Sequence, residues 1–373
     1  MRALPLKLFM TTDAVGGVFS YAVDLAHALV PYGVETTLAV LGPAMTPCQR
    51  ETATVPGVDV LPLDLPLDWL AGSRCDVLAA AAAAVADRAA GADVVQLNAP
   101  ALAAVRQPAP VVGVVHSCVA SWWAAVRGGE PPADFSWRTD LLADGLARCD
   151  AVVVPSRAFG ATVARLYGVA PEVVRNGRAA APRRGPSPEP AGFAFTAGRL
   201  WDEGKDVATL DAAAARMAVP LLAAGPTTGP DGGAAVRLAH ARALGALDAG
   251  AVRDLLARRP VFVSTALYEP FGLAVLEAAQ AGCPLVLSDI PTFRELWGGA
   301  AILVPPRDPA AVADAVNRLA ADPAEARERG AAAATRAARY GLDSMARAMA
   351  HLYDGLARGR TRRAVVVQPG AVA

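Results

Sequence analysis

Apolar and polar positions alternate along the chain between two kinds of segment. Short runs rich in valine, leucine and alanine are separated by longer stretches in which apolar residues recur at helical spacing. The run 111–115 reads Val-Val-Gly-Val-Val and has no polar alternation, as expected for a strand covered on both faces of a parallel sheet. This alternation predicts an α/β fold in which parallel strands are connected by crossover helices.

The predicted elements form two series. The first series has strands at 6–12, 35–41, 58–63, 93–97, 110–116, 151–155 and 172–174, with helices at 18–30, 75–90, 137–149 and 156–167. The second series has strands at 193–197, 221–224, 261–264, 285–288 and 301–304, with helices at 206–218, 249–258, 271–281, 309–321 and 323–339. Each series has the order of a Rossmann-like, doubly wound domain.

A proline-rich, charged segment separates the two series. Residues 181–191 read Ala-Pro-Arg-Arg-Gly-Pro-Ser-Pro-Glu-Pro-Ala, which is typical of a domain linker. We therefore predict an N-terminal domain at 1–180, joined by a final helix at 343–358, and a C-terminal domain at 192–340. Residues 359–373 are expected to be a flexible tail. Two such domains facing each other would place a ligand in a deep cleft between the carboxyl ends of their strands.

Composition and charge exclude several classes of protein. The 35 basic and 35 acidic residues cancel, so no global field favours nucleic acid or an anionic membrane. The chain is 54% hydrophobic, yet no uncharged apolar stretch is long enough to span a bilayer, and the first residues resemble a strand and not a signal peptide. Five scattered cysteines without a C-x-x-C pair argue against a disulfide scaffold or a zinc site. A cytoplasmic location is expected.

Two features of the first series are candidates for ligand binding. Gly16 and Gly17 precede the first helix, where small residues let the backbone approach a ligand and the helix N-terminus favours anions. The turn is not G-x-G-x-x-G, and no acidic residue closes the second strand, so a dinucleotide fingerprint is absent. His116 ends a predicted strand at the same sheet edge, where its position fits a functional and a structural role equally.

The loop after the first strand of the second series carries two basic residues. Arg199 and Lys205 emerge from one strand-to-helix turn and could converge on a diphosphate, one as a planar fork and one as a point charge. The chain has thirty-three arginines but only two lysines, Lys7 and Lys205. This scarcity favours a functional role for Lys205 over a solvated loop.

Residues 264–278 hold a proline, a glycine and two glutamates close together. Pro270 suits the first turn of a helix beginning at Phe271, which would leave the amides of Phe271, Gly272 and Leu273 able to bind phosphate oxygens. Glu269 precedes this helix and Glu277 lies within it.

Carboxylates beside an anion site are electrostatically unfavourable unless they accept hydrogen bonds from hydroxyl groups. Sugar and ribose hydroxyls are the natural donors to Glu269 and Glu277.

The segment from Glu269 to Glu277 resembles the signature of a known family. Glu269-x7-Glu277 with Glu-Pro-Phe-Gly-Leu is similar to the signature of the family 4 retaining glycosyltransferases, which have the GT-B fold. Further similar motifs are Gly16-Gly17, His116, Val154-Pro155-Ser156-Arg157, Asn176-Gly177, Gly198-Arg199-Leu200 and Ala281-Gly282-Cys283-Pro284. The second half carries the more specific motifs.

The resemblance implies a retaining glycosyltransferase that moves a sugar from a UDP- or GDP-linked donor to an acceptor hydroxyl. It implies that Glu277 binds the ribose, that Glu269 binds the transferred sugar, and that Arg199 and Lys205 bind the diphosphate. The amides of Phe271, Gly272 and Leu273 would add donors. His116, Gly16 and Gly17 would meet the sugar and phosphates from the other domain, and the backbone near Leu247 would face the base.

One motif departs from the family, which often has lysine and then glycine where this chain has Gly204-Lys205. This order leaves the contact made by Lys205 open.

No D-x-D motif occurs, so we expect neither a metal ion nor another cofactor. A GT-B-fold sugar-nucleotide epimerase and a non-catalytic sugar-nucleotide binding protein remain alternatives. The epimerase would need acid/base carboxylates in the first domain, and none is identified there. A phosphorylase-type enzyme would need a pyridoxal lysine, a role that suits neither lysine.

Overall fold

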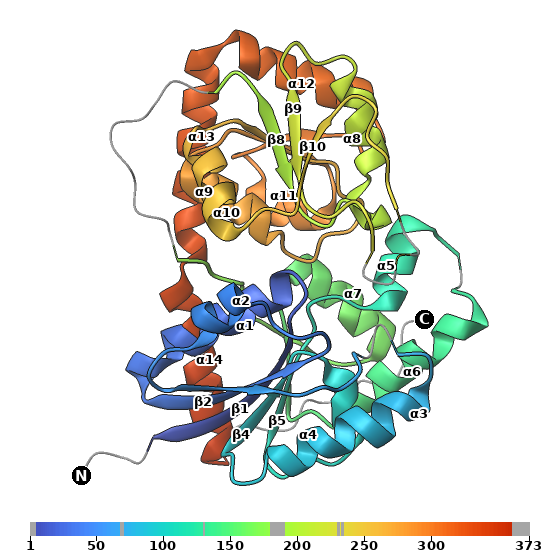
Figure 1. The fold of residues 1–373 in the computed structure, drawn as a ribbon, viewed down its shortest axis with the longest axis vertical. Helices are drawn as coiled ribbons and strands as arrows, with labels where there is room; N and C mark the ends of the chain where they lie inside the picture. Colours follow the sequence, from blue (N-terminus) through green and yellow to red (C-terminus); the bar gives the residue numbers. More distant parts are fainter. Residues whose placement is uncertain are drawn as a thin grey trace, which may run out of the picture. The chain divides into compact units, whose positions relative to one another are not determined.

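The computed structural model describes residues 5–67, 71–129, 131–179, 191–229, 232 and 235–359. The chain divides into two compact units, one made of residues up to Gly177 together with those from Leu342 on, and one spanning Arg178–Gly341 (Figure 1). The predicted linker 181–191 lies outside the described residues except for Ala191, as does the predicted tail beyond Gly359.

The first unit is built on a parallel sheet whose strands, in the described part of the chain, follow the order β3-β2-β1-β4-β5-β6-β7. The strands are β1 (Leu6–Asp13), β2 (Val34–Leu41), β3 (Val58–Pro62), β4 (Val94–Leu97), β5 (Val111–Val114), β6 (Ala151–Val154) and β7 (Glu172–Val173). The helices are α1 (Gly17–Leu29), α2 (Pro47–Ala53), α3 (Arg74–Asp76), α4 (Ala83–Arg88), α5 (Val119–Val126), α6 (Ala133–Leu146), α7 (Arg157–Tyr167) and α14 (Leu342–Ala357). A π-helical segment, Val77–Ala82, connects α3 to α4.

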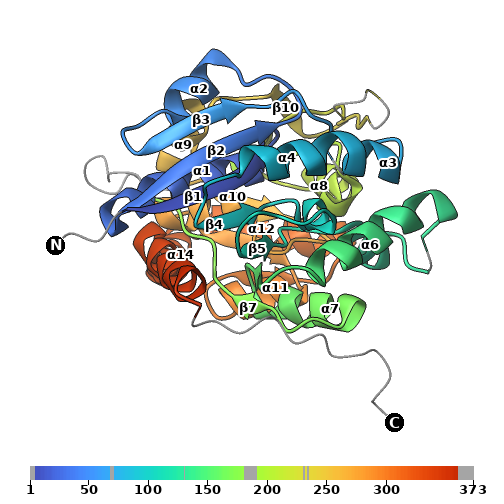
Figure 2. The ribbon, with the colours of Figure 1, turned by 90° about the horizontal axis from the view of Figure 1, so that it is seen from below.

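The C-terminal helix α14 belongs to the core of this first unit. Its apolar face, which includes Met349 and Tyr353, packs with Leu25 and Leu29 of α1 in one buried cluster over the sheet. Helix α4 lies on the other side of the same sheet (Figure 2). The sheet is therefore covered on both faces, which is why its central strands β4, β5 and β6 are buried along their whole length.

The second unit repeats the architecture. Among the described residues its parallel sheet has the strand order β10-β9-β8-β11-β12-β13. The strands are β8 (Ala194–Ala197), β9 (Leu221–Ala224), β10 (Arg242–Gly245), β11 (Val261–Ser264), β12 (Leu285–Ser288) and β13 (Ile302–Val304). The helices are α8 (Val207–Ala214), α9 (Ala249–Ala257), α10 (Leu273–Ala281), α11 (Pro291–Trp297), α12 (Pro309–Ala321) and α13 (Pro323–Ala337).

Two parallel, helix-covered sheets confirm the predicted α/β fold with two Rossmann-like, doubly wound domains. In both sheets the strand order reverses beside the first strand of the series, β1 or β8. The loops that follow β1 and β8 at their carboxyl ends therefore lie where this class of fold binds its ligands.

Several elements differ from the prediction. The hydrophobic pattern misses β10, because this strand is largely exposed and lacks an apolar run. Helix α10 begins at Leu273 and not at Phe271, since Gly272 has left-handed backbone angles (φ 90°, ψ 69°) that a helix cannot continue through. Pro270 consequently lies before the helix cap and not in the first turn.

Candidate functional site

Two loops of the second unit meet at the carboxyl ends of the neighbouring strands β8 and β11. The carbonyl oxygen of Gly204 accepts hydrogen bonds from the amides of Leu267 (2.9 Å) and Tyr268 (3.2 Å). The Thr265 hydroxyl donates to the carbonyl oxygen of Lys205 at 3.1 Å. Backbone groups thus hold the β8 loop against the loop that leads into α10.

This junction brings Lys205 and Glu269 together. Lys205 Nζ lies 2.5 Å from Glu269 Oε2, and the two side chains are 25% and 16% exposed. Because Lys205 lies on the β8 loop and Glu269 on the loop before α10, the ion pair depends on the backbone contacts that join these loops. The Gly204-Lys205 order therefore still delivers the ammonium group to the glutamate.

Arg199 is held by a residue that the sequence analysis does not single out, Asp202. Arg199 Nη2 donates to Asp202 Oδ2 at 2.9 Å, while Asp202 Oδ1 accepts from the amide of Gly204 at 2.9 Å. The Arg199 guanidinium also lies 5.6 Å from the centre of the Trp201 ring. Asp202 is buried and orients both Arg199 and the 3₁₀ turn Glu203–Lys205. An aspartate two residues before a glycine is a common turn signal that could have pointed to it.

The N-terminus of α10 faces the same junction with its backbone donors. Gly272 caps the helix with a positive φ, and a Cβ there would lie 3.3 Å from Phe293 Cε1. No described residue accepts a hydrogen bond from the amides of Phe271, Gly272 or Leu273. These amides and the positive end of the helix dipole form a local preference for an anion.

Glu277 lies farther along α10 and has an arginine partner. Its Oε1 is 2.7 Å from Nη2 of Arg178, whose carbonyl oxygen accepts a hydrogen bond from Gln280 Nε2 at 3.0 Å. Arg178 was not predicted as a site residue, because nothing in the sequence separates it from thirty-two other arginines. Each of the two predicted glutamates thus has its own basic partner.

A close approach of two glycines shapes the start of the β8 loop. The amide of Gly198 donates to the carbonyl oxygen of Ala224 at 3.0 Å. Gly225, which follows Ala224 in the chain, has φ 137°. A Cβ on Gly225 would lie 1.7 Å from the Gly198 carbonyl oxygen. Only glycine therefore fits at position 225, because this residue packs against Gly198, which directly precedes Arg199.

Leu247 follows β10 and its side chain packs against the hydrophobic core of the second unit. The adjacent Asp248 caps α9 by accepting a hydrogen bond from the Ala251 amide at 2.8 Å. Both side chains therefore have structural tasks, and the Leu247 backbone is the part of this residue left for ligand contact.

In the first unit, Gly16 is the cap residue of α1 with φ 77°, and Gly17 is the first residue of the helix. Open space surrounds the position where a Cβ of Gly16 would lie. The preceding turn is closed by Asp13, whose Oδ1 accepts from the amide of Val15 at 2.7 Å. The turn therefore presents backbone, and no large side chain, at the end of β1.

His116 lies just beyond β5 and is partly buried. Its Nε2 is 2.9 Å from Asn98 Oδ1, and its ring meets the ring of Tyr21 edge to face, with centroids 4.5 Å apart. Burial lowers the pKa of His116 to about 4. At neutral pH the imidazole is therefore uncharged.

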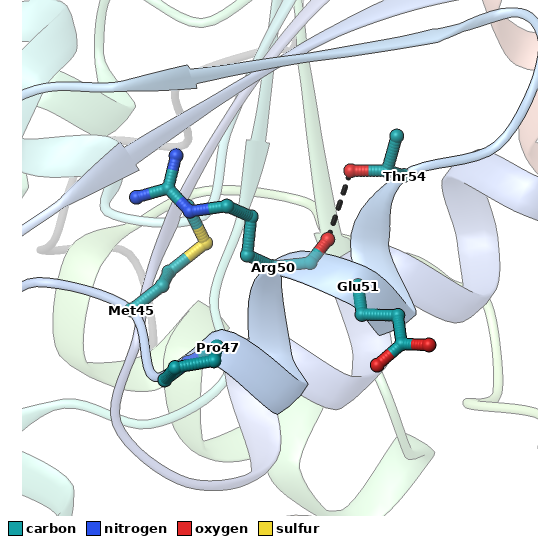
Figure 3. Close-up of a pocket in the computed structure, with 5 residues that line it drawn as sticks. All are labelled: Met45, Pro47, Arg50, Glu51 and Thr54. Atoms are coloured by element: carbon teal, nitrogen blue, oxygen red, sulfur yellow. Dashed lines mark hydrogen bonds between the residues drawn. The ribbon is translucent and has the colours of Figure 1, made fainter.

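A surface pocket in the first unit lies apart from these residues. It is lined by Met45, Pro47, Arg50, Glu51 and Thr54, on α2 and the loop before it (Figure 3). None of the predicted site residues lines this pocket.

The described residues hold no group of three or more His, Cys, Asp or Glu side chains that could bind a metal ion. In the same part of the chain, no helix combines the length and apolar character that crossing a bilayer requires.

Both halves of the chain match family models. Residues 15–179 match the model described as Glycosyltransferase Family 4, and residues 193–322 match the model described as Glycosyl transferases group 1. Together with the two doubly wound domains, these matches define the class: the chain belongs to the glycosyltransferases that have the GT-B fold. Within that class, the chain belongs to glycosyltransferase family 4, which confirms the resemblance found in the sequence.

Individual relatives match over different lengths. A glycogen synthase of Mycobacterium tuberculosis is 43% identical over 97 residues, which are 26% of this chain and 23% of that protein. A D-inositol 3-phosphate glycosyltransferase of Streptomyces bingchenggensis is 28% identical over 304 residues, covering 70% of this chain and 65% of that protein. The match to the glycogen synthase thus spans about a quarter of that relative.

Solved structures share the fold over almost the whole chain. Sucrose-phosphate synthase from Thermosynechococcus elongatus superimposes with a TM-score of 0.78 at 20% identity, covering 95% of this chain and all of that one. HepE of Anabaena, in complex with UDP and glucose, gives a TM-score of 0.73 at 17% identity, covering 94% of this chain and all of that one.

Proposed function

We propose that the chain transfers a sugar from a UDP- or GDP-linked donor to an acceptor hydroxyl with retention of anomeric configuration. The observation that carries the proposal is the convergence of Lys205, Glu269 and the N-terminus of α10 at one loop junction. A diphosphate requires positive charge and N–H donors, whereas a sugar hydroxyl requires an acceptor. Both kinds of group are present in the second unit.

Each predicted residue has a role in this proposal. Arg199 and Lys205 bind the diphosphate together with the amides of the residues that begin α10. Glu269 accepts a hydrogen bond from the transferred sugar, and Glu277 accepts one from the ribose. These last two residues bind different ligand groups because Glu269 lies on the loop before α10 and Glu277 lies within the helix.

The remaining contacts follow the family resemblance. The amides of Phe271, Gly272 and Leu273 donate to phosphate oxygens, and the Leu247 backbone faces the base. Gly16 and Gly17 contact the donor through their backbone. HepE structures hold UDP-glucose as well as UDP with glucose, which supports a nucleotide-sugar donor for a chain of the same fold.

The proposed reaction breaks the bond between the anomeric carbon and the diphosphate oxygen, and both electrons leave with the diphosphate. The acceptor oxygen then forms its bond to the anomeric carbon on the same face. The acceptor proton passes to the departing phosphate oxygen. Arg199, Lys205 and the α10 amides stabilise the negative charge that develops on the leaving group.

These cationic groups let the reaction proceed without a metal ion or another cofactor, and we propose the cytoplasm as its location. Turnover should survive EDTA, because the chain's own groups offset the charge of the diphosphate. Loss of turnover that only Mn²⁺ or Mg²⁺ restores would contradict this part of the proposal.

Calorimetric titration with UDP and with GDP tests the diphosphate site. Lys205→Ala and Arg199→Ala should each weaken the better nucleotide about ten- to a hundred-fold, the value of one charged hydrogen bond. Lys7→Ala removes the chain's other lysine, which lies on β1, and is the matched control. Equal binding by all four proteins would refute the assignment, and release of nucleoside diphosphate from donor plus acceptor distinguishes an enzyme from a binding protein.

A further inference from the structure

Buried polar side chains form a hydrogen-bonded network that ends at His116 in the first unit. Thr11 of β1, Gln96 of β4 and Asn98 just beyond β4 are all at most 9% exposed. Tyr353 of α14 is fully buried and donates its hydroxyl hydrogen to Gln96 Oε1. The binding roles proposed above do not use this network.

The direction of each hydrogen bond follows from one group that can only accept. Asn98 Nδ2 lies 2.7 Å from the carbonyl oxygen of Thr11, so this end of the amide must be the NH₂ group. The other end is therefore the oxygen, and it faces His116 Nε2 at 2.9 Å. Gln96 Nε2 donates to the same oxygen at 3.2 Å.

His116 must then donate through Nε2. An amide oxygen has no hydrogen to offer, so the short contact exists only if Nε2 carries the proton. Since burial keeps the ring neutral at pH 7, the imidazole has one proton in total. Nδ1 is left as a hydrogen-bond acceptor, and no described residue donates to it.

We infer that Asn98 is a positioning residue that holds His116 as the Nε2-protonated tautomer. Gln96 donates a hydrogen bond to Asn98 and accepts one from Tyr353. A residue of the C-terminal helix thus helps to fix the tautomer of His116. The edge-to-face contact with Tyr21 restrains the ring plane, at an interplanar angle of 68°. The imidazole thus contacts Tyr21 of α1 and Asn98 beyond β4 directly, and is linked to α14 through Gln96.

The tautomer has a consequence for the ligand, and this step rests on the proposed function. A neutral His116 with a bare Nδ1 accepts a hydrogen bond, so its partner must be a donor such as a sugar or acceptor hydroxyl. A phosphate oxygen offers no hydrogen and would be repelled by the nitrogen lone pair. Among the groups of a nucleotide sugar, His116 is therefore assigned to a hydroxyl and not to the diphosphate.

The tautomer can be measured on the full chain with ¹⁵N-labelled histidine, because a protonated and an unprotonated ring nitrogen have well separated ¹⁵N shifts. The chain has four histidines, and the signal lost in His116→Gln assigns His116. We expect Nε2–H with an unprotonated Nδ1 at pH 7 and a mixture of tautomers in Asn98→Ala. A wild-type spectrum with the proton on Nδ1, or an unchanged spectrum in Asn98→Ala, would overturn the inference.

Two further variants guard against general effects on folding. Gln107→Ala removes another buried amide of the same unit, whose Nε2 donates to the carbonyl oxygens of Leu102 and Val105. It should leave the His116 signals unchanged. Asn98→Asp places a carboxylate opposite Nε2 and so favours the charged imidazolium. Protons on both ring nitrogens of His116 at pH 7 are therefore expected in Asn98→Asp, which tests the contact even if Asn98→Ala does not fold.

Activity gives a second, separate readout. Asn98→Ala should lower kcat/KM for sugar transfer about three- to tenfold, the range expected for one neutral hydrogen bond. Asn98→Asp should not recover the loss, because a protonated Nδ1 cannot accept a hydrogen bond, while binding of the nucleoside diphosphate alone to Asn98→Ala stays unchanged. Weakened binding of that nucleotide would contradict the hydroxyl assignment. If the wild type transfers no sugar but shows the Asn98-dependent tautomer, the proposed function fails and the role of Asn98 stands.

Discussion

Replacing Glu269 by glutamine changes one charge and almost nothing in shape. In the structure this carboxylate contacts Lys205 Nζ at 2.5 Å, so Glu269→Gln removes the counter-charge of the ammonium group that we assign to the diphosphate. A nucleoside diphosphate competes with Glu269 for Lys205 in the wild type. In the variant that competition is weaker, because a neutral amide oxygen attracts the ammonium less.

The size of the effect follows from the exposure of the pair. A hydrogen bond between charged groups contributes about 1.5–3 kcal/mol, but partial exposure lets water screen part of it. The side chains are 25% and 16% exposed, and the Lys205 ammonium group has three hydrogens, so it can bind the phosphate without leaving Glu269. We therefore expect the nucleoside diphosphate to bind Glu269→Gln as tightly as wild type, or up to about tenfold more tightly.

Catalysis should respond in the opposite direction. Glu269 is proposed to accept a hydrogen bond from a sugar that gains positive charge as the leaving group departs. An interaction that strengthens in the transition state appears in kcat. Glu269→Gln should lower kcat about ten- to a hundred-fold, which corresponds to the loss of one charged hydrogen bond.

Glu277→Gln provides the contrast. Its proposed ribose contact is present in donor and product alike, so its loss should raise KM and weaken the nucleoside diphosphate about tenfold. The control is Glu325→Gln in α13, since Glu325 is also ion-paired to arginines but lies on another helix. Calorimetric titration with the nucleotide and steady-state kinetics measure both effects. Equal weakening of the nucleotide by Glu269→Gln and Glu277→Gln would refute the division of roles.

Two other predictions concern stability. Gly225→Ala should destabilise the second unit and weaken nucleotide binding, because the new Cβ would overlap the Gly198 carbonyl oxygen at 1.7 Å; Gly192→Ala, which meets open space, is the control in thermal unfolding. Because folding lowers the pKa of His116 from 6.5 to about 4, the contribution of His116 to stability should be constant above pH 6.5 and fall as the pH drops towards 4. The loss amounts to at most about 3 kcal/mol, since the unfolded chain binds the proton first. Urea unfolding should show a smaller pH dependence in His116→Gln, and an unchanged slope would contradict the assignment.

The fold could be predicted from the sequence wherever a strand or helix has its own local pattern. Apolar runs such as 111–115 indicate buried parallel strands because both faces of each sheet are covered. The edge strand β10 could not be found in this way, since its side chains are largely exposed. The start of α10 was displaced by two residues because the prediction relied on Pro270, whereas the left-handed backbone of Gly272 decides where the helix begins.

The candidate site likewise contains residues that the sequence singles out and residues that only the folded structure reveals. Glu269, Glu277, Arg199 and Lys205 could be selected from the sequence because a motif and a scarcity of lysine single them out. Asp202 carries only a weak turn signal, and its hold on Arg199 becomes apparent only when the loop is seen folded.

Arg178 and Asn98 show what the sequence alone could not provide. Nothing local distinguishes either residue, because an arginine among thirty-three or an asparagine after a strand has many uses.

By itself, the sequence determined most of the strands, the longer helices and the loops that hold the chemical groups, because these depend on neighbours along the chain. It missed β10 and the short helices α2, α5 and α11. Only the tertiary structure decided the pairs: Lys205 with Glu269 across 64 residues, Arg178 with Glu277, and Asn98 with His116. The physical reason is that such contacts depend on strand order and on backbone hydrogen bonds between loops. The carbonyl oxygen of Gly204, which binds two amides of a distant loop, sets where Lys205 meets its partner.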